Sequence, residues 1–380
     1  MTNKHITILG GFGSVGIEAA QYLLQHSDVT ITLAARTPRT LPKHIVELYM
    51  HRIKIKALDA TNTTALTQVC VESDLLISCI GPSGILGDLV PKACKKHNTP
   101  LVDAGGYDPV INSLDKDEKK SPSQVPLIIN VGLLPGISGI FPSYVINQAC
   151  KDKKIKQLDV QYVGRDAWTY NSAWDIINGL GDFGTEKGFC YVEQGKLIKV
   201  PMFKASNKCH FPSPIGSAST MLLYAEEMAR LAQQQQIKTT KVYGANIGPR
   251  ATLICMIAKI FGMYRTHKSI NKAAKWLVKA SKKDMKKMIP AYGIQVDITN
   301  EASEAICGQI MLEDTYQATG ATIGIAARAI LENKGPKPGV YMLHEALDST
   351  WFIEQLQQAD LIKLLNINTN KYFKLAGAIQ

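Results

Sequence analysis

Lys4-His5-Ile6-Thr7-Ile8-Leu9-Gly10-Gly11-Phe12-Gly13-Ser14-Val15-Gly16 is the stretch that decides the fold of this 380-residue chain. Residues 4–9 are an apolar, β-branched run that predicts a strand, and residues 15–25 have the apolar spacing of a helix. Glycines between a strand and a helix allow a tight turn and let a pyrophosphate approach the amides at the helix start. This context predicts a dinucleotide-binding loop, whereas the glycine spacing alone would be a weak signal. The expected contacts are Gly11, Phe12, Gly13, Ser14 and Val15.

Arg36, at the end of a second strand expected over residues 29–35, indicates which dinucleotide binds. An acidic residue at this place normally accepts a hydrogen bond from the ribose 2′-hydroxyl, whereas an arginine can neutralise a 2′-phosphate. Thr37 and Arg39 add a hydroxyl and a second guanidinium, which suit a phosphate dianion. We therefore expect NADP(H) rather than NAD(H). The alternative is that Arg36 and Arg39 are ordinary surface arginines.

The first third of the chain keeps alternating strands and helices. Strands are expected over residues 53–58, 75–80 and 100–106, and helices over residues 63–72 and 88–97. The continuous apolar run 75–80 is typical of a strand buried on both faces of a parallel sheet. In such sheets ligands bind beyond the carboxyl ends of the strands. The strand-end candidates for cofactor contact are Asp59, Cys79, Ile80, Gly81 and Pro82.

Asp103 and Tyr107, at the end of the fifth expected strand and in the following loop, are the catalytic candidates. Hydride transfer from a nicotinamide needs a group that supplies a proton or offsets developing charge. A tyrosine can donate the proton, and an aspartate can stabilise an iminium or position water. The alternatives are that Asp103 only caps the turn at Gly105 and Gly106 and that Tyr107 only packs.

Beyond residue 115 the pattern changes. A polar stretch, residues 115–124, links to strands expected over residues 125–131, 157–163, 189–192 and 196–202. Together with a helix over residues 219–233, these segments predict an antiparallel or mixed sheet in a second domain. Four residues after the strand at 157–163 can line a substrate site or form an interface or core edge: Arg165, Trp168, Tyr170 and Trp174. The lone His210 is a weaker acid–base candidate.

The net charge of +11 lies almost wholly in residues 250–290, where two arginines and nine lysines face one acid, Asp284, giving +10. Residues 251–264 are an apolar run too short for a bilayer span of about 20 residues. Residues 269–288 predict an amphipathic helix with a basic face. This segment can be a solvated face or lid, an attractor of acidic substrates, or a peripheral membrane contact. Nucleic acid is not expected, because no reader motif accompanies the lysines.

Composition favours a cytoplasmic enzyme of about two domains. The chain is 46% hydrophobic and 20% charged, and its start lacks a secretory pattern. Its 8 cysteines form neither a CxxC pair nor a metal-ligand spacing with histidine. Reduced thiols and no bound metal are therefore expected.

Several of these motifs together resemble the saccharopine dehydrogenase-like reductases. They are the glycine loop 10–16, Cys-Ile-Gly-Pro at 79–82, Val-Asp-Ala-Gly at 102–105, Gly-Leu-Leu-Pro-Gly at 132–136, and the C-terminal runs 319–322 and 338–345. The resemblance implies an α/β fold in which an N-terminal Rossmann domain, with a doubly wound parallel sheet, is completed by C-terminal helices. A central α+β domain for substrate binding and dimerisation is inserted between them. The implied bounds are 1–125, 126–334 and 335–380.

The family resemblance implies a homodimer and an NADPH-dependent reductase of an imine or carbonyl of a small metabolite. Saccharopine and carboxynorspermidine reductases usually carry an acidic residue directly before this Pro-Gly, where the present chain has Leu134. Two alternatives therefore stay open. One is an enoyl or keto reductase of an acyl or lipid-like substrate at a membrane surface, and the other is a non-catalytic NADP(H)-binding protein.

Overall fold

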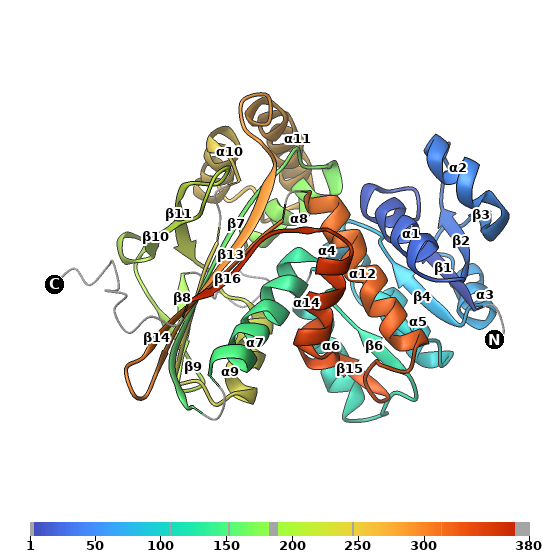
Figure 1. Ribbon diagram of the computed structural model, residues 1–380. Coiled ribbons are helices and arrows are strands. Elements are labelled where there is room, and N and C mark those ends of the chain that lie inside the picture. The colour runs from blue at the N-terminus through green and yellow to red at the C-terminus, as the bar shows by residue number, and fades with distance from the viewer. Residues whose placement is uncertain are drawn as a thin grey trace. The chain divides into compact units, whose positions relative to one another are not determined.

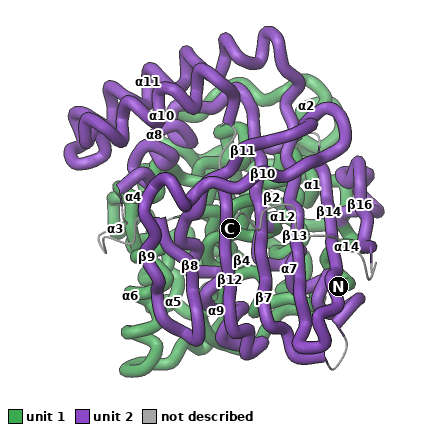
Figure 2. The backbone as a smooth tube through the Cα atoms, turned by 90° about the vertical axis from the view of Figure 1, so that its left-hand side faces the viewer, with its two compact units in different colours: residues 1–137, 316–355 green, residues 138–315, 356–380 purple. Residues whose placement is uncertain are grey.

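Parallel strands in the order expected of a dinucleotide-binding sheet form the core of the first part of the chain. The computed structural model describes residues 4–106, 108–150, 153–181, 189–244, 247–312 and 314–368. Within these ranges the chain divides into two compact units, residues 1–137 with 316–355 and residues 138–315 with 356–380 (Figure 2).

The first unit contains a seven-stranded sheet in its described residues, and every strand pair is parallel. All four residues of its β4 strand are buried, as expected of a strand covered on both faces. Helices lie on either side of this sheet in Figure 1. The strands in sheet order are β15 (Gly339–Tyr341), β6 (Pro126–Ile128), β5 (Leu101–Asp103), β4 (Leu75–Ser78), β1 (His5–Leu9), β2 (Thr30–Ala35) and β3 (Ile53–Ala57).

The three helices predicted in the first unit, over residues 15–25, 63–72 and 88–97, begin and end close to α1, α3 and α5. The helix expected over residues 63–72 is capped by Asn62, whose side-chain oxygen accepts a hydrogen bond from the amide of Ala65. The helices are α1 (Ser14–His26), α2 (Lys43–Tyr49), α3 (Thr63–Glu72), α4 (Ser83–Leu86), α5 (Leu89–Lys96), α6 (Asp108–Glu118), α12 (Thr315–Leu331), α13 (Leu343–Ala346) and α14 (Ser349–Gln358).

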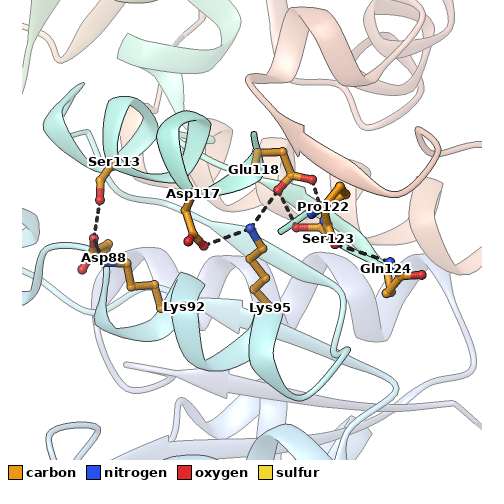
Figure 3. Close-up of polar contacts among 9 residues, drawn as sticks. All are labelled: Asp88, Lys92, Lys95, Ser113, Asp117, Glu118, Pro122, Ser123 and Gln124. Carbon is orange, nitrogen blue, oxygen red and sulfur yellow. Dashed lines mark hydrogen bonds and ion pairs between the residues drawn. The ribbon is translucent and has the colours of Figure 1, made fainter. Parts of the chain in front are cut away.

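A buried lysine ties two of these helices together (Figure 3). Lys95 on α5 has a side chain only 9% exposed, and its ammonium lies 2.9 Å from Asp117 and 3.2 Å from Glu118 on α6. Glu118 also accepts hydrogen bonds from the amide and hydroxyl of Ser123, in the loop that leads to β6. The Lys95 side chain is shielded, whereas those of Asp117 and Glu118 are 41% and 24% exposed. The network connects α5, α6 and the start of β6, and solvent screens part of its charge interaction.

A mixed sheet organises the second unit, which contains nine strands in its described residues. Seven form a continuous path, and a hairpin of two further strands attaches to β12. In path order the strands are β10 (Ser206–His210), β11 (Ser217–Leu222), β12 (Thr239–Gly244), β7 (Ile155–Arg165), β13 (Ala291–Asn300), β14 (Ala305–Leu312) and β16 (Ile362–Asn368), and the hairpin is β8 (Cys190–Glu193) and β9 (Lys196–Lys199). Its helices are α7 (Ser138–Ala149), α8 (Tyr170–Gly179), α9 (Glu226–Gln234), α10 (Pro249–Ile260) and α11 (His267–Asp284).

Three expected segments differ from the structure. The helix predicted over residues 219–233 is wrong in its first part, because residues 217–222 form β11 between β10 and β12, and the helix starts at Glu226. The polar stretch 115–124 is helical up to Glu118. The strand expected over 196–202 ends at Lys199, and Met202 begins a 3₁₀ turn.

The expected α/β fold with a Rossmann sheet is confirmed, but the unit bounds differ from the expected domain bounds. The first unit extends beyond residue 125 to 137, because β6 pairs with β5. The chain returns to it at Tyr316 rather than at residue 335. On α12, a Cβ added to Gly320 would lie 2.6 Å from the Ala19 amide nitrogen, so this glycine lets α12 lie directly on α1. The last strand, β16, pairs with β14 and so belongs to the second unit.

Candidate cofactor and active site

The glycine loop between β1 and α1 has no room for larger side chains at its two ends. Gly10 has a φ of +74°, and a Cβ there would lie 2.5 Å from the carbonyl oxygen of Cys79. A Cβ on Gly16 would lie 2.4 Å from the carbonyl oxygen of Gly10. Gly13 differs, because its nearest such neighbour is 3.3 Å away and the residue is exposed. The loop is therefore closely packed beneath and open at Gly13, where a phosphate group would need to approach the backbone.

The start of α1 offers backbone donors to an anion. Gly13 occupies the N-cap position, and as a glycine it has no side chain to cap the first amides of the helix. Ser14 is exposed, and Phe12 and Val15 are half-buried. Amides at a helix N-terminus together with the positive end of the helix dipole bind phosphate groups. These residues fit the pyrophosphate of a dinucleotide.

Arg36 directly follows β2. It lies on the surface, as do Thr37 and Arg39. Asp59, at the end of β3, is also exposed, and its carboxylate accepts from the amide and hydroxyl of Thr61. These two hydrogen bonds, with a smaller contribution from the charge of Arg36, hold the pKa of Asp59 below its ordinary value. Arg36 is thus close enough to Asp59 for their charges to interact, and its guanidinium remains open to solvent.

The residues that follow β4 touch the glycine loop through the backbone. The Cys79 amide donates to the carbonyl of Leu9 over 2.8 Å, and the Cys79 carbonyl is what excludes a side chain at Gly10. Burial raises the pKa of the Cys79 thiol, so the sulfur stays protonated and is a packing group rather than a nucleophile. Ile80, Gly81 and Pro82 continue from it as half-buried residues up to the start of α4.

Asp103, at the carboxyl end of β5, is a buried carboxyl group with few partners. Its side chain is 7% exposed, and it accepts from the Gly105 amide at 3.3 Å and from the Ser78 hydroxyl. Burial raises the pKa of Asp103 to about 6, and these two hydrogen bonds only partly offset the effect. A carboxyl group with such a pKa can hold or release a proton near neutral pH.

Asn130 is the site residue that the sequence did not single out. It follows β6, is 1% exposed, and has a φ of 60°, which is uncommon for a residue other than glycine. Within the described residues, neither its amide nitrogen nor its amide oxygen has a hydrogen-bond partner. A Cβ added to Gly105 would lie 3.2 Å from Asp103 Oδ2 and 3.5 Å from Asn130 Oδ1, so the two side chains are neighbours.

An unpaired buried amide costs about 1–3 kcal/mol, and such a group needs an explanation. Here it lies beside the catalytic candidate Asp103, at the sheet edge where ligands bind in this class of fold. The signal in the sequence was a single polar residue, Asn130, within the apolar run 127–131. Tyr107, the other catalytic candidate, lies outside the described residues.

The four substrate candidates of the second unit are engaged in contacts within that unit. Arg165 donates to the backbone carbonyls of Ile289 and Pro214. Trp174 is buried among α8, α10 and α11, and its indole N–H donates to Asn271 at 2.8 Å. The Tyr170 hydroxyl also donates to Asn271. The Trp168 indole nitrogen is buried with no hydrogen-bond partner in the described part of the chain. The separate acid–base candidate His210 has its Nδ1 3.0 Å from the Ser217 hydroxyl. Their role in substrate binding stays a prediction.

Comparison with known protein families decides the identity of the first unit. Residues 6–125 match the model of the saccharopine dehydrogenase NADP binding domain. Residues 6–125 are therefore a saccharopine dehydrogenase-like NADP-binding domain. The expected resemblance is therefore confirmed, and so is NADP(H) as the cofactor. The closely packed glycine loop and the solvent-facing Arg36 fit this saccharopine dehydrogenase-like domain.

One solved structure shows that the fold of the chain is shared, and two others have a weaker likeness. Saccharopine dehydrogenase (L-Glu forming) from Saccharomyces cerevisiae is similar with a TM-score of 0.67 and 14% identity, covering 97% of this chain and 100% of that chain. An engineered D-amino acid dehydrogenase bound to NADP+ has a TM-score of 0.47 and 13% identity, with 95% and 100% covered. A meso-dapdh mutant of Clostridium tetani E88 has a TM-score of 0.46 and 13% identity, with 94% and 99% covered. No curated protein matches the chain.

Proposed function

We propose that the protein is an NADPH-dependent oxidoreductase of saccharopine dehydrogenase type that delivers hydride to an imine or carbonyl carbon of a small metabolite. The observation that supports this most is the buried pair Asp103 and Asn130, at the same edge of the sheet as the NADP-binding loop. One is a carboxyl group that titrates near neutral pH, and the other is an amide with no partner among the described residues.

The protein's own contribution would be binding, orientation and proton supply, since NADPH when bound supplies the hydride. Arg36 binds the 2′-phosphate, and the amides at the start of α1 bind the pyrophosphate. Asp103 carries a proton on its carboxyl oxygen and donates it to the nitrogen or oxygen that gains negative charge. Asn130 offers both a donor and an acceptor to orient the bound molecule beside Asp103.

Leu134 bears on the substrate. It follows Leu133 in the turn at residues 133–137, and its side chain is 47% exposed. An apolar side chain at this place supplies no charge to a cationic amino group of the substrate. We propose that the acceptor is bound here through apolar contact and that the polar groups of Asp103 and Asn130 fix its reacting atoms.

The direct test is oxidation of NADPH, followed by absorbance, with a panel of imines formed from amines and 2-oxo acids and a panel of ketones. Turnover with a member of either panel, lowered at least about hundredfold in Asp103→Asn, supports the proposal. Asp159→Asn is the matched control, because Asp159 on β7 is also buried with its pKa raised by burial to about 6. NADPH binding without turnover on any substrate would instead indicate a non-catalytic NADP(H)-binding protein.

The homodimer implied by the family resemblance stays a proposal. Light scattering of the purified protein tests it directly. A mass of two chains supports a dimer, and a mass of one chain at all concentrations tested contradicts it.

A further inference from the structure

Helix α10 of the second unit carries a row of large apolar side chains that point into solvent. Leu253, Met256, Ile260 and Phe261 are exposed by 55, 56, 74 and 75%. Their spacing places them along one side of the helix. We name them the α10 apolar row. Single exposed apolar residues are ordinary on protein surfaces, but a contiguous row of four marks an interaction site.

This row is held on a fixed pair of helices. The other side of α10 packs against α8 and α11 through buried residues such as Ala251 and Ala258. Asp284, at the end of α11, is buried and accepts from the amides of Arg250 and Ala251, each at 2.9 Å. It also pairs with the Arg250 guanidinium at 3.2 Å. Helices α10 and α11 are therefore joined as a packed pair. Both figures of the whole chain show them side by side (Figures 1 and 2).

Helix α11, which packs against α10, has a strongly basic exposed surface. Eight lysines are exposed on it or directly after it, and within the described residues none forms an ion pair: Lys268, Lys272, Lys275, Lys279, Lys282, Lys283, Lys286 and Lys287. Asp284, the single acid among residues 250–290, is already used in anchoring α10. Among the residues that the structure describes, the lysines thus form a positive surface without ion-pair partners. Trp276, which lies beneath the Lys272 ammonium at 5.0 Å, adds an amphipathic ring of the kind found at membrane interfaces.

We propose that the α10–α11 pair docks on an anionic lipid bilayer, with the α10 apolar row entering the boundary between headgroups and acyl chains. The α11 lysines face the anionic headgroups. Apolar burial combined with attraction to anionic lipid is how interfacial helices bind membranes. The binding is peripheral, because α10 has 12 residues and no helix in the described part of the chain is long and apolar enough to cross a bilayer.

The charged and apolar parts of the α10–α11 surface argue against two other binding partners, a second copy of the chain and nucleic acid. A second copy of the chain on this face would bring two segments of charge +10 together, within the screening distance of about 8–10 Å. Nucleic acid would satisfy the lysines but would leave Ile260 and Phe261 in water. An anionic bilayer can pair with the α11 lysines and also bury the α10 apolar row. This inference goes beyond the proposed oxidoreductase activity and does not depend on it.

Co-sedimentation of the full chain with vesicles tests the proposal. We expect binding to vesicles of phosphatidylcholine with phosphatidylserine that is at least about tenfold tighter than to phosphatidylcholine alone and that weakens with salt. The triple variant Lys275→Glu, Lys279→Glu and Lys282→Glu should lose about a hundredfold or more in affinity, because each lysine near such a surface contributes severalfold. The double variant Ile260→Asp and Phe261→Asp should lose at least tenfold.

Matched controls lie in the first unit. Val71→Asp changes an isolated apolar residue, 69% exposed on α3, and the triple variant Lys116→Glu, Lys119→Glu and Lys120→Glu reverses three other exposed lysines. Both should sediment like the unchanged protein, and NADPH titration should show that every variant is folded. Absence of vesicle binding by the unchanged protein would overturn the proposal, as would equal losses in the controls. A change of oligomer mass in the α10 double variant, without vesicle binding by the unchanged protein, would show that a second copy covers the row.

Discussion

Asp103 is buried beside Asn130, and this burial gives it both its proposed chemistry and a measurable signature. A carboxylate removed from water is destabilised, so the proton is held to a higher pH than in an exposed aspartate. Two hydrogen-bond donors, the Gly105 amide and the Ser78 hydroxyl, limit the rise. Because only these two groups among the described residues donate hydrogen bonds to Asp103, its pKa stays high enough for it to act as a proton donor near neutral pH.

The raised pKa predicts how stability depends on pH. The pKa of Asp103 rises from 3.8 unfolded to about 6 folded, so its stabilising effect is fully present below about pH 4 and is lost as pH rises through 6. The loss amounts to about 3 kcal/mol at most. We expect the unfolding free energy of the unchanged protein, relative to Asp103→Asn, to fall between pH 4 and pH 6. Urea unfolding of both proteins at a series of pH values measures this, and a constant difference would contradict the assignment.

At the scale of elements, the glycines of the β1–α1 loop have different structural roles. Gly16 is required by packing, since a Cβ would lie 2.4 Å from the carbonyl oxygen of Gly10. A Cβ on the exposed Gly13 would lie 3.3 Å from the same oxygen, a tight but much milder contact. Such a division is expected where one glycine permits close approach of a pyrophosphate and another permits close packing of helix on strand.

Two alanine substitutions separate these tasks. Gly16→Ala should lower the unfolding free energy by about 2 kcal/mol or more, because the backbone contact at 2.4 Å leaves no room for a methyl group. Gly13→Ala should lower stability clearly less than Gly16→Ala, because its closest contact is 3.3 Å, and should weaken NADPH binding. Thermal unfolding combined with NADPH fluorescence titration distinguishes them. Equal stability losses in both variants would show that the loop is not divided in this way.

Local patterns explain which elements were predictable from the sequence. The strand, glycine turn and helix of residues 4–26 depend on neighbours in the chain, so their type follows from spacing alone. Residues 217–222 form a strand only because β10 and β12 lie on either side, which is a non-local cause that periodicity does not report. The first compact unit extends to residue 137 for a similar reason, since β6 pairs with β5.

In the candidate site, too, only the residues that belong to a local sequence pattern could be predicted. Asp103 was accessible to sequence reasoning because a carboxylate at a strand end is a local pattern. Asn130 became evident only through its burial and its unpaired amide, which depend on the packing of β5, β6 and the turn at residues 132–136. Likewise, an arginine at the end of β2 is visible in the sequence, but its exposure is a property of the fold.

At the scale of the whole molecule, the two units have separable roles in the account. The first holds the glycine loop, Arg36 and the Asp103–Asn130 pair, and the second holds a nine-stranded sheet in its described residues and the α10–α11 surface. Cofactor binding should therefore protect the first unit selectively.

Hydrogen exchange measures this selectivity. With saturating NADP(H) we expect slower amide exchange at residues 10–17, 36–40 and 79–82, at the carboxyl ends of β1, β2 and β4. Peptides from β13 and β14 (Ala291–Leu312) serve as the internal control and should exchange at unchanged rates. Protection spread evenly over both units, or absent from residues 10–17, would contradict the placement of the cofactor.

The central claim is that Arg36 selects the phosphorylated dinucleotide, and calorimetric titration of the purified protein with NADPH and NADH tests it most directly. The unchanged protein should bind NADPH more tightly than NADH. Arg36→Asp should weaken NADPH binding about ten- to a hundredfold, the worth of one charge-assisted contact, with little effect on NADH. Lys43→Asp, which makes the same reversal of charge at an exposed residue of α2, should change neither. Failure to bind NADPH, or equal losses of both cofactors in Arg36→Asp, would contradict the account.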